Sequence, residues 1–265
     1  MQSPVPGVPG VPGVPGVAGV PGAGPPLFLV PAGELSADVV TLSGPEGHHA
    51  AAARRLRAGE RADVTDGAGT IAECTVVSVS KETVMLTVRS VRVVPPPDPR
   101  ITVVQALPKG DRAELAVELM TEVGVDAIVA WAAERSITRW HGDRGDRALG
   151  KWRVTAREAA KQSRRAWIPE MTGPAGLTDV TKLAAEASGA VVLEADAATP
   201  LSTLALPERG SIVLVVGPEG GISPAERAAL AGAGAVEARL GPTVLRTSTA
   251  GAAAATVLLA RTGRW

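Results

Sequence analysis

The chain has 265 residues, of which 45% are apolar, enough for one large domain or two small ones with a buried core. Lys and Arg together number 27, as do Asp and Glu, so the overall charge gives no support to nucleic-acid binding and any such site must be local. Cys74 is the single cysteine, which excludes an internal disulfide, and no His or Cys cluster has metal-ligand spacing. Without an apolar run of membrane-spanning length, we expect a soluble, cytoplasmic protein that needs no metal.

Residues 1–26 repeat Val, Pro and Gly too often for a helix or a buried strand, so we expect a disordered tail without a role in chemistry. Residues 27–95 contain several short strand patterns and a helical stretch at 48–59, which together predict a small barrel-like domain. The pair Asp66-Gly67 predicts a hairpin. The prolines between 95 and 99 predict a stiff linker that ends this domain.

Strand and helix patterns alternate over residues 100–265, which predicts an α/β domain with a parallel sheet covered on both faces. A first helix is expected from Asp111 to Gly124, with Leu115 and Leu119 on its inner face, and a longer one over 148–167. The remaining predicted strands are 101–107, 126–131, 190–194, 211–216 and 236–240.

Two segments near the C-terminus combine a strand end, a glycine turn and a helix start. The first, VLVVGPEGGISPAE at 213–226, contains Ser223 and Glu226 at the spacing of a capping box, with Pro224 at the first helical position. Its glycines permit close backbone approach to a ligand, but a simple tight turn explains them equally well. The segment matches neither a dinucleotide fingerprint nor a P-loop.

The second segment, LGPTVLRTSTAGAAAA at 240–255, repeats this arrangement and adds Arg246 before a run of hydroxyl residues suited to helix caps. A guanidinium at a helix start opposes the helix dipole and is tolerated where an anion or polar ligand lies nearby. Arg246 therefore stands out as a candidate functional residue.

These motifs resemble the RsmE group of SPOUT methyltransferases. The resemblance rests on GPEGG followed by SxxE and on LGPxVLRTSTA, and extends to LPKGDRAELAVELMTEVGVDAI, ERS, KWRVTAREAAKQSRR and HHAAAARRLRAGE, so it covers Phe28 to Trp265. It implies a PUA-like RNA-binding barrel and an α/β domain with a deep trefoil knot. The implied activity is methylation of uridine N3 in 16S ribosomal RNA of the 30S subunit, with S-adenosylmethionine (SAM) as donor, by a homodimer whose pocket is completed at the subunit interface.

The resemblance also implies where the methyl donor binds, in a cleft formed by three knot loops. The implied contacts are Leu193, Glu194, Gly217, Pro218, Gly220, Gly221, Leu240, Gly241, Leu245, Thr247 and Ser248. Catalysis requires alignment of the methyl group and removal of the N3 proton. We expect Arg246 to stabilise negative charge on the uracil and Glu219 or Glu122 to accept the proton.

Residues 135–165 contain ten basic and three acidic residues, a local excess of positive charge. Helical spacing places several of the basic residues on one face, which is typical either of a solvated surface or of phosphate contacts. With the resemblance, the expected RNA contacts are Arg153, Arg157, Lys161, Gln162, Arg164 and Arg165. A smaller patch contains His49, Arg54 and Arg55, although His49 also fits a structural role. Lys109 and Arg112 are weaker candidates.

Two other functions remain open from the sequence. A nonenzymatic RNA-binding protein would use only the barrel and the basic helix, and a SPOUT methyltransferase could act on another RNA. A nucleotide-dependent enzyme would need a lysine and Mg²⁺ ligands beside the glycine loop, and these are missing.

Overall fold

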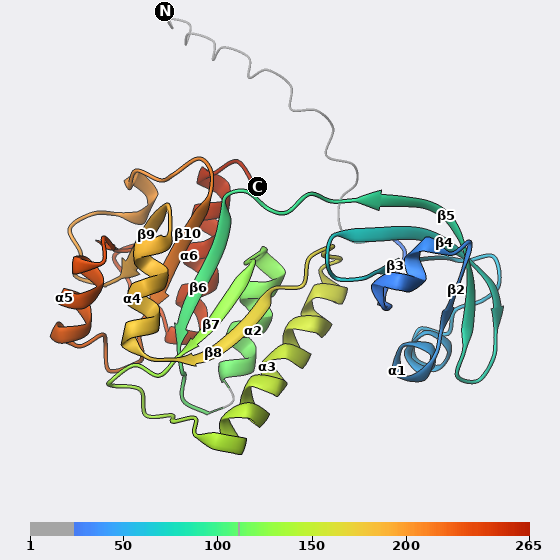
Figure 1. Ribbon diagram of the computed structural model, residues 1–265, viewed down its shortest axis with the longest axis horizontal. Helices are drawn as coiled ribbons and strands as arrows, with labels where there is room; N and C mark the ends of the chain where they lie inside the picture. Colours follow the sequence, from blue (N-terminus) through green and yellow to red (C-terminus); the bar gives the residue numbers. More distant parts are fainter. Residues whose placement is uncertain (1–23, 111) are drawn as a thin grey trace, which may run out of the picture.

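The computed structural model describes residues 24–110 and 112–265. The predicted disordered tail covers residues 1–26, of which 1–23 lie outside this part, and so does the predicted helix start at Asp111. Figure 1 shows a small β module and a larger α/β module joined by an extended segment. The prolines between 95 and 99 lie in that segment, between the last strand of the first sheet and the first strand of the second.

The small module is a five-stranded sheet in the order β1-β3-β4-β5-β2, with β1 parallel to β3 and all other pairs antiparallel. A buried core of mainly aliphatic residues around Phe28 lies inside it. A helix was predicted over 48–59, but the observed helical stretch begins earlier and ends earlier. It consists of α1 followed by a single π-helical turn that ends at Ala53. The elements are β1 (Leu27–Leu29), a 3-10 turn (Ala32–Ser36), β2 (Val39–Leu42), α1 (Gly44–His48), the π turn (His49–Ala53), β3 (Arg61–Thr65), β4 (Thr70–Val79) and β5 (Val84–Val93).

The predicted hairpin at Asp66-Gly67 is confirmed and joins β3 to β4. Asp66 Oδ1 accepts hydrogen bonds from the backbone nitrogens of Ala68 (2.7 Å) and Thr70 (3.0 Å). Gly67 has φ +71°, a conformation that favours glycine. The turn therefore holds its shape through one carboxylate and one permissive backbone position.

The large module is a six-stranded, fully parallel sheet in the order β11-β9-β10-β6-β7-β8, which confirms the predicted α/β class. Its strands are β6 (Arg100–Ala106), β7 (Ala127–Trp131), β8 (Glu170–Ala175), β9 (Gly189–Leu193), β10 (Ser211–Val216) and β11 (Val236–Ala238). Its helices are α2 (Arg112–Val123), α3 (Gly142–Gln162), α4 (Leu177–Glu186), α5 (Pro224–Gly232) and α6 (Thr247–Arg261), with a 3-10 turn at Leu201–Thr203.

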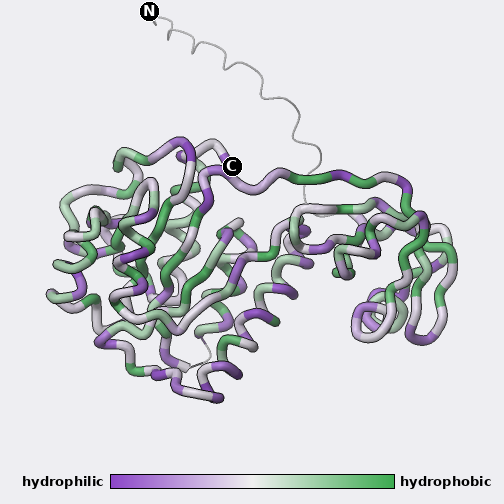
Figure 2. Tube along the Cα trace, in the orientation of Figure 1, coloured by the Kyte–Doolittle hydropathy of each residue, from purple (hydrophilic) through white to green (hydrophobic). Residues whose placement is uncertain are grey.

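Helices cover both faces of this sheet (Figure 1). One buried cluster packs α2, α3 and α6 on one face, and a second packs α4 and α5 on the other. The apolar central strands lie between these layers, as the hydrophobic colouring in Figure 2 shows. Trp140 and Trp152 meet edge to face in the first cluster, with ring centroids 5.0 Å apart.

Two helix predictions are wrong in detail. Leu115 is 43% exposed, whereas Leu119 packs against the core as predicted, beside the buried Ala116, Val117 and Met120. The helix predicted over 148–167 runs from Gly142 to Gln162. It ends early because Arg164 adopts a left-handed conformation, φ +57°, which an α-helix cannot continue.

The residues after α3 form a seam between the two modules. Trp167 pairs with Ala68 in an isolated antiparallel bridge, and its indole Nε1 donates to Val94 O at 3.1 Å. Ile168 N donates to Gly67 O, and Gly69 N donates to Ala166 O, both at 2.9 Å. The Asp66-Gly67 hairpin is thus hydrogen-bonded directly to the segment of the α/β module that leads into β8.

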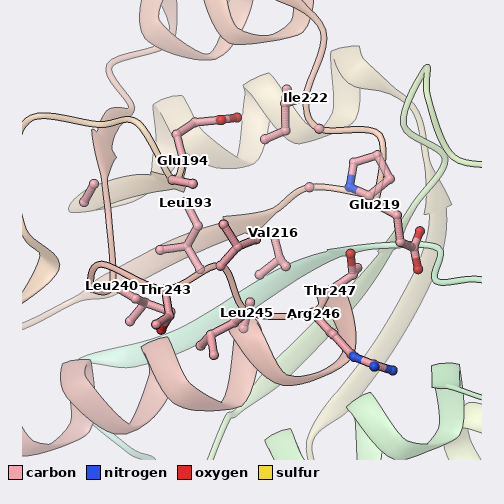
Figure 3. A pocket seen from close by; sticks show the side chains of 18 of the residues that line it. Leu193, Glu194, Val216, Glu219, Ile222, Leu240, Thr243, Leu245, Arg246 and Thr247 are labelled. Atoms are coloured by element: carbon pink, nitrogen blue, oxygen red, sulfur yellow. The ribbon is translucent and has the colours of Figure 1, made fainter.

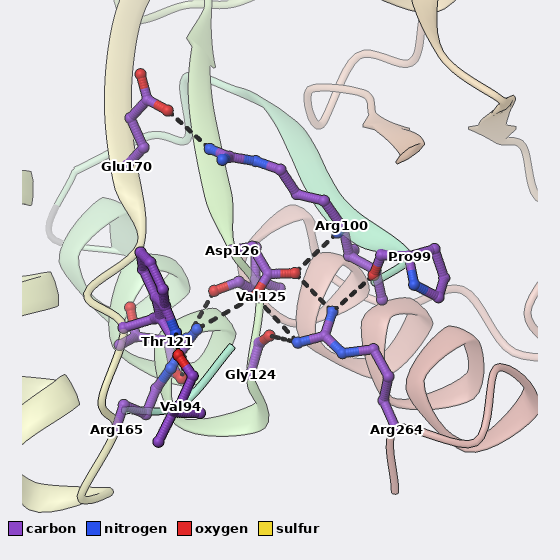
Figure 4. A network of polar contacts seen from close by, with 12 residues as sticks. Val94, Pro99, Arg100, Thr121, Gly124, Val125, Asp126, Arg165, Glu170 and Arg264 are labelled. Carbon is purple, nitrogen blue, oxygen red and sulfur yellow. Dashed lines mark hydrogen bonds and ion pairs between the residues drawn. The ribbon is translucent and has the colours of Figure 1, made fainter. Parts of the chain in front are cut away.

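A polar network around Asp126 lies near the same seam (Figure 4). Its carboxylate accepts hydrogen bonds from Ile101 N (2.8 Å) and from both Arg264 terminal nitrogens (2.6 and 3.0 Å), and pairs with Arg165 at 3.5 Å. Arg165 also donates to Thr121 O and Val125 O. Burial lowers the pKa of Arg165 to about 10, although Asp126 opposes this shift.

Candidate active site

A cavity of about 390 Å³ opens at the carboxyl ends of β9 and β10. Three segments line it: the end of β9 with Glu194, the glycine loop after β10, and the segment from Leu240 into the start of α6 (Figure 3). Ligand sites of open α/β sheets lie at this edge, and the volume falls within the roughly 300–1,000 Å³ typical of small-molecule pockets. The two glycine turns identified in the sequence therefore share one cavity.

Most of the residues expected to hold a methyl donor lie in this wall. The lining members are Leu193, Glu194, Gly217, Pro218, Gly221, Leu240, Gly241, Leu245 and Thr247. Gly220 and Ser248 are not part of the lining: Gly220 O accepts a bond from Arg135, and Ser248 is buried in the first turn of α6. Both expected catalytic residues, Glu219 and Arg246, do line the cavity.

The cavity has an apolar centre between differently charged ends. Leu193, Val216 and Ile222 contribute aliphatic surface. Glu194 lies toward one end, while Glu219 and Arg246 lie toward the other (Figure 3). An elongated ligand with an apolar or aromatic part and polar groups at both ends matches this distribution.

Glycine is required at the turn after β10 for reasons of space. A Cβ on Gly217 would lie 2.7 Å from Ile222 Cγ1, closer than carbon atoms can approach. Gly221 has φ +73°, which favours glycine over other residues. The turn can therefore keep this conformation in the cavity wall only with glycine at positions 217 and 221.

The predicted capping box is present at the start of α5. Ser223 Oγ accepts a bond from Glu226 N (3.3 Å), and Glu226 Oε2 accepts one from Ser223 N (2.9 Å). The other carboxylate oxygen, Oε1, accepts a bond of 2.7 Å from Glu134 N in the loop after β7. Glu226 is buried and so joins two loops at the site, a role that helix-capping patterns in the sequence do not indicate.

Further hydrogen bonds connect the loops after β6, β7 and β10. Arg135 Nη1 donates to Gly220 O at 3.1 Å, Thr138 Oγ1 donates to Pro108 O at 2.9 Å, and Lys109 N donates to Glu219 Oε1 at 3.3 Å. The loop after β6 therefore contacts Glu219, one of the two expected proton acceptors.

Arg246 occupies the N-cap position of α6, with φ −69° and ψ 150°, and its side chain makes no cap bond. The hydroxyl residues suited to this role lie elsewhere: Thr247 and Ser248 are buried in the first turn, and Thr249 Oγ1 donates to Arg246 O at 3.2 Å. The exposed guanidinium extends along the cavity mouth (Figure 3). It is thus available to a ligand.

Two residues at the site were given little or no weight from the sequence. Arg112 was named only as a weak RNA-binding candidate, and Gln105 was not named. Arg112, at the start of α2, lines the cavity, as does Arg246. Gln105, fully buried in β6, donates from Nε2 to Ala106 O (3.1 Å) and Thr247 O (3.3 Å) beneath the start of α6. The signal for Gln105 was an amide within an otherwise apolar strand pattern.

Charged residues behind the cavity affect Glu194. Burial raises the pKa of its carboxyl, Arg227 at 3.9 Å lowers it, and Asp196 and Glu237 add to the rise. Arg227 itself makes a bidentate pair with Glu237 at 2.7 and 2.6 Å. Glu194 thus lies in the cavity wall 3.9 Å from Arg227, a guanidinium that donates its hydrogen bonds to Glu237.

Family models match both modules of the chain. An RNA methyltransferase domain matches residues 95–259, and an RNA methyltransferase PUA domain matches residues 42–88. Ribosomal RNA small subunit methyltransferase E of Mycobacterium tuberculosis is 47% identical over 231 residues, covering 86% of this chain and 88% of that protein. The chain belongs to the ribosomal RNA small subunit methyltransferase E family. The Bacillus subtilis member is 29% identical, over 81% and 87% of the two chains.

Solved structures agree with membership of this family. The family member from Neisseria gonorrhoeae, bound to SAM, has a TM-score of 0.77 and 26% identity over 90% of this chain and 98% of its own. A Legionella pneumophila methyltransferase in complex with SAM has a TM-score of 0.78 and 27% identity with the same coverage. The resemblance to the RsmE group, the α/β class and the PUA-like barrel are therefore confirmed, while the trefoil knot stays a prediction.

The residues expected to contact RNA differ in their surroundings, and several of them already have partners within the protein. Lys161 is buried, with its ammonium 2.9 Å from Glu46 and 3.0 Å from Glu158. Arg165 is held by the Asp126 network. Arg157 is exposed but pairs with Glu46 at 3.2 Å, and Arg153 donates to Met171 O. These four side chains have structural partners that the helical spacing did not indicate.

The remaining expected RNA contacts gather between the barrel and the end of α3. Arg54, Gln162 and Arg164 line a second, more polar cavity of about 490 Å³, and Arg54 Nη2 donates to Gln162 Oε1 at 3.3 Å. Arg55 is exposed nearby with φ 53°. His49 packs edge to face on Phe28, 5.9 Å between centroids, which favours a structural role for its ring.

The described residues contain no group of three or more His, Cys, Asp or Glu side chains arranged to hold a metal ion. Within the same part of the chain, every helix is too short or too polar to cross a membrane. Cys74 is buried, and burial raises the pKa of its thiol to about 11.

Proposed function

We propose that this protein uses SAM to methylate N3 of a specific uridine in 16S ribosomal RNA of the small ribosomal subunit, in the cytoplasm. The observation that carries the proposal is the single cavity enclosed by both glycine turns, in a chain whose relatives are named for small-subunit rRNA methylation. Two relatives of similar fold were solved with SAM. The target atom and base follow from the family resemblance alone.

The residues of the cavity fit such a donor. Aliphatic side chains such as Leu193 and Leu240 offer an apolar slot for an adenine, and Glu194 offers a carboxyl for hydroxyl groups. When bound, SAM supplies an electrophilic methyl group. The protein then needs to hold the donor, exclude water and align the uracil nitrogen.

Arg246 and Glu219 are proposed to act on the uracil. The exposed guanidinium of Arg246 stabilises the negative charge that develops on the carbonyl oxygens as N3 loses its proton. Glu219 accepts that proton, with its carboxylate positioned by Lys109 N. Glu122 is not part of this proposal, since it lies near the other end of α2 and is absent from the cavity wall.

The RNA is proposed to contact the barrel and the end of α3 as well as the cavity. The cavity lined by Arg54, Gln162 and Arg164, with Arg55 beside it, offers exposed donors for phosphates. Arg153 and Arg157 can contribute charge from the exposed face of α3. Lys161 instead joins the modules through Glu46 of the barrel, and Arg165 is held within the α/β module by Asp126. His49 is proposed only as a support for this surface.

We also propose that the protein is a homodimer in which the partner completes the cavity. Val244 and Leu245 support this, because they are 82% and 40% exposed at the cavity mouth although both are aliphatic. The proposed trefoil knot involves the three segments that line the cavity, between Leu193 and Thr249.

The decisive experiment is mass-spectrometric mapping of 16S rRNA from cells with and without the gene for this protein. One N3-methyluridine should disappear without it and return when purified protein and SAM are added to the mutant 30S subunits. Loss of a different modification would show that the protein methylates another RNA position. Absence of SAM binding by calorimetry would favour a nonenzymatic RNA-binding protein instead.

A further inference from the structure

Three basic residues lie at or near the mouth of the active-site cavity. Lys109, Arg112 and Arg135 all have exposed side chains. Within residues 24–110 and 112–265, none of the three forms an ion pair with a carboxylate. Glu219 lies beside them, but its Oε1 accepts a bond from the backbone of Lys109 rather than from a side chain.

The backbone that carries these three residues is held in place. Arg135 is bonded to Gly220 O, and its loop is joined to the preceding loop through Thr138 and Pro108. The buried Glu226 fixes the same loop at Glu134 N. Arg112 begins α2 and lines the cavity wall itself. The backbone segments that carry these cations thus keep defined positions around the opening.

The end of α3 differs in this respect. There Lys161 and Arg157 share the carboxylate of Glu46, and Arg165 is held by Asp126. A cation already paired with a carboxylate has less to gain from a phosphate, since the existing pair must first be broken. Among the described residues, Lys109, Arg112 and Arg135 have no such carboxylate partner to give up.

We propose that Lys109, Arg112 and Arg135 form a mouth rim that binds the RNA backbone phosphates flanking the target nucleotide. The proposal rests on the function proposed above. A base in a structured RNA must leave its stack to enter an enclosed cavity, and its flanking phosphates then lie at the opening. Two guanidiniums suit bidentate phosphate contacts, and the lysine adds a mobile point charge.

The test compares the wild-type protein with the triple variant Lys109→Gln, Arg112→Gln, Arg135→Gln. Arg209→Gln is the matched control, because Arg209 is exposed just before β10, at the opposite edge of the sheet. Binding to 16S rRNA transcribed in vitro is measured over a range of salt concentrations. Calorimetry gives the Kd for SAM, and thermal unfolding checks the fold. A second variant, Arg135→Lys, keeps the charge in case loss of the Gly220 bond disturbs the loop.

We expect the triple variant to bind rRNA at least about tenfold more weakly, with the salt slope reduced by about two, given roughly 0.7 per single-strand phosphate contact. Its Kd for SAM should change by less than its Kd for rRNA, because Arg112 is the one member of the three that lines the cavity. Arg209→Gln should match wild type in all three measurements, and Arg135→Lys should retain most of the rRNA affinity.

If the folded triple variant showed the wild-type salt dependence of rRNA affinity, the proposed phosphate contacts of the mouth rim would be wrong. A weakened Kd for SAM with normal rRNA binding would also contradict them, because it would assign these cations to the carboxylate of the methyl donor. Failure of the function itself has a different signature, since wild-type protein would then transfer no methyl group to 30S subunits. The two ideas can therefore fail separately.

Discussion

Glu226 Oε1 accepts a hydrogen bond of 2.7 Å from the backbone nitrogen of Glu134, 92 residues earlier in the chain. Its second oxygen caps α5 through Ser223 N. One buried carboxylate therefore determines both where the glycine loop enters its helix and where the loop after β7 lies. Positions at the active site depend on a residue that does not line the cavity.

Glu226→Gln should lower both stability and SAM affinity. A glutamine has one acceptor oxygen, so either Ser223 N or Glu134 N loses its partner while buried, which costs about 1–3 kcal/mol. Denaturant unfolding and calorimetry with SAM measure the two effects. Glu208→Gln, at an exposed loop position, serves as the control. A variant that loses stability but binds SAM normally would show that the two loops are not coupled to the donor site.

Arg246→Ala should slow methyl transfer about 10²–10³-fold, the usual effect of removing one donor that stabilises a developing oxyanion. The Kd for SAM should change little, because the side chain points along the mouth and caps nothing. Single-turnover transfer to 30S subunits lacking the modification measures the rate. Full transfer by this variant with normal donor binding would remove Arg246 from the mechanism.

Gly217→Ala should weaken SAM binding and destabilise the fold by about 1–3 kcal/mol, the usual cost of an overpacked site. The new methyl group would lie 2.7 Å from Ile222 and would force the cavity wall to move. Gly232→Ala is the matched control, since no atom lies within 4 Å of its Cβ position and alanine favours the helix there. Calorimetry and thermal unfolding distinguish the two variants.

The Arg227–Glu237 ion pair should make the free energy of unfolding depend on pH in the acidic range. Two hydrogen bonds from Arg227 hold the pKa of Glu237 below its ordinary value of 4.5. Because the pKa of Glu237 is lower in the folded state than in the unfolded state, the ion pair stabilises the fold at pH values above the unfolded-state pKa. This stabilisation is lost as the pH falls through the folded-state pKa. Both side chains are 32% exposed, so we expect only about 0.5–1 kcal/mol near neutral pH.

Comparing the unfolding free energies of wild type and Glu237→Gln between about pH 7 and pH 3 tests this window. The difference between the two proteins should shrink below about pH 4.5. A constant difference across that range would mean that the carboxylate titrates alike in both states.

Strands were the easier elements to predict from the sequence, for reasons visible at β10. Its bounds, Ser211–Val216, were predicted correctly because an apolar run is enclosed by Gly210 and Gly217. β8 was missed, since Gly173 and Pro174 argue against a strand, and they are tolerated because β8 is at the sheet edge. α4 was missed along with it.

The cavity was predictable because its glycines and Arg246 follow one another at strand ends. The charged partners were not. Glu46 lies 115 residues from Lys161, and no helical periodicity can reveal that a carboxylate in the barrel neutralises that lysine. A basic stripe and a buried ion pair have the same pattern in the sequence, and tertiary structure distinguishes them.

The seam at Trp167 affects how the two modules can be studied. Leu27 and Ile71 of the barrel pack with Ala166, and Val94 and Trp167 pack against them. Removing residues before the linker would expose this apolar cluster and leave the Trp167–Ile168 backbone without its hydrogen-bond partners. A truncated enzyme that loses activity would therefore say little about what the barrel does for RNA, and single surface substitutions are the cleaner means of dissection.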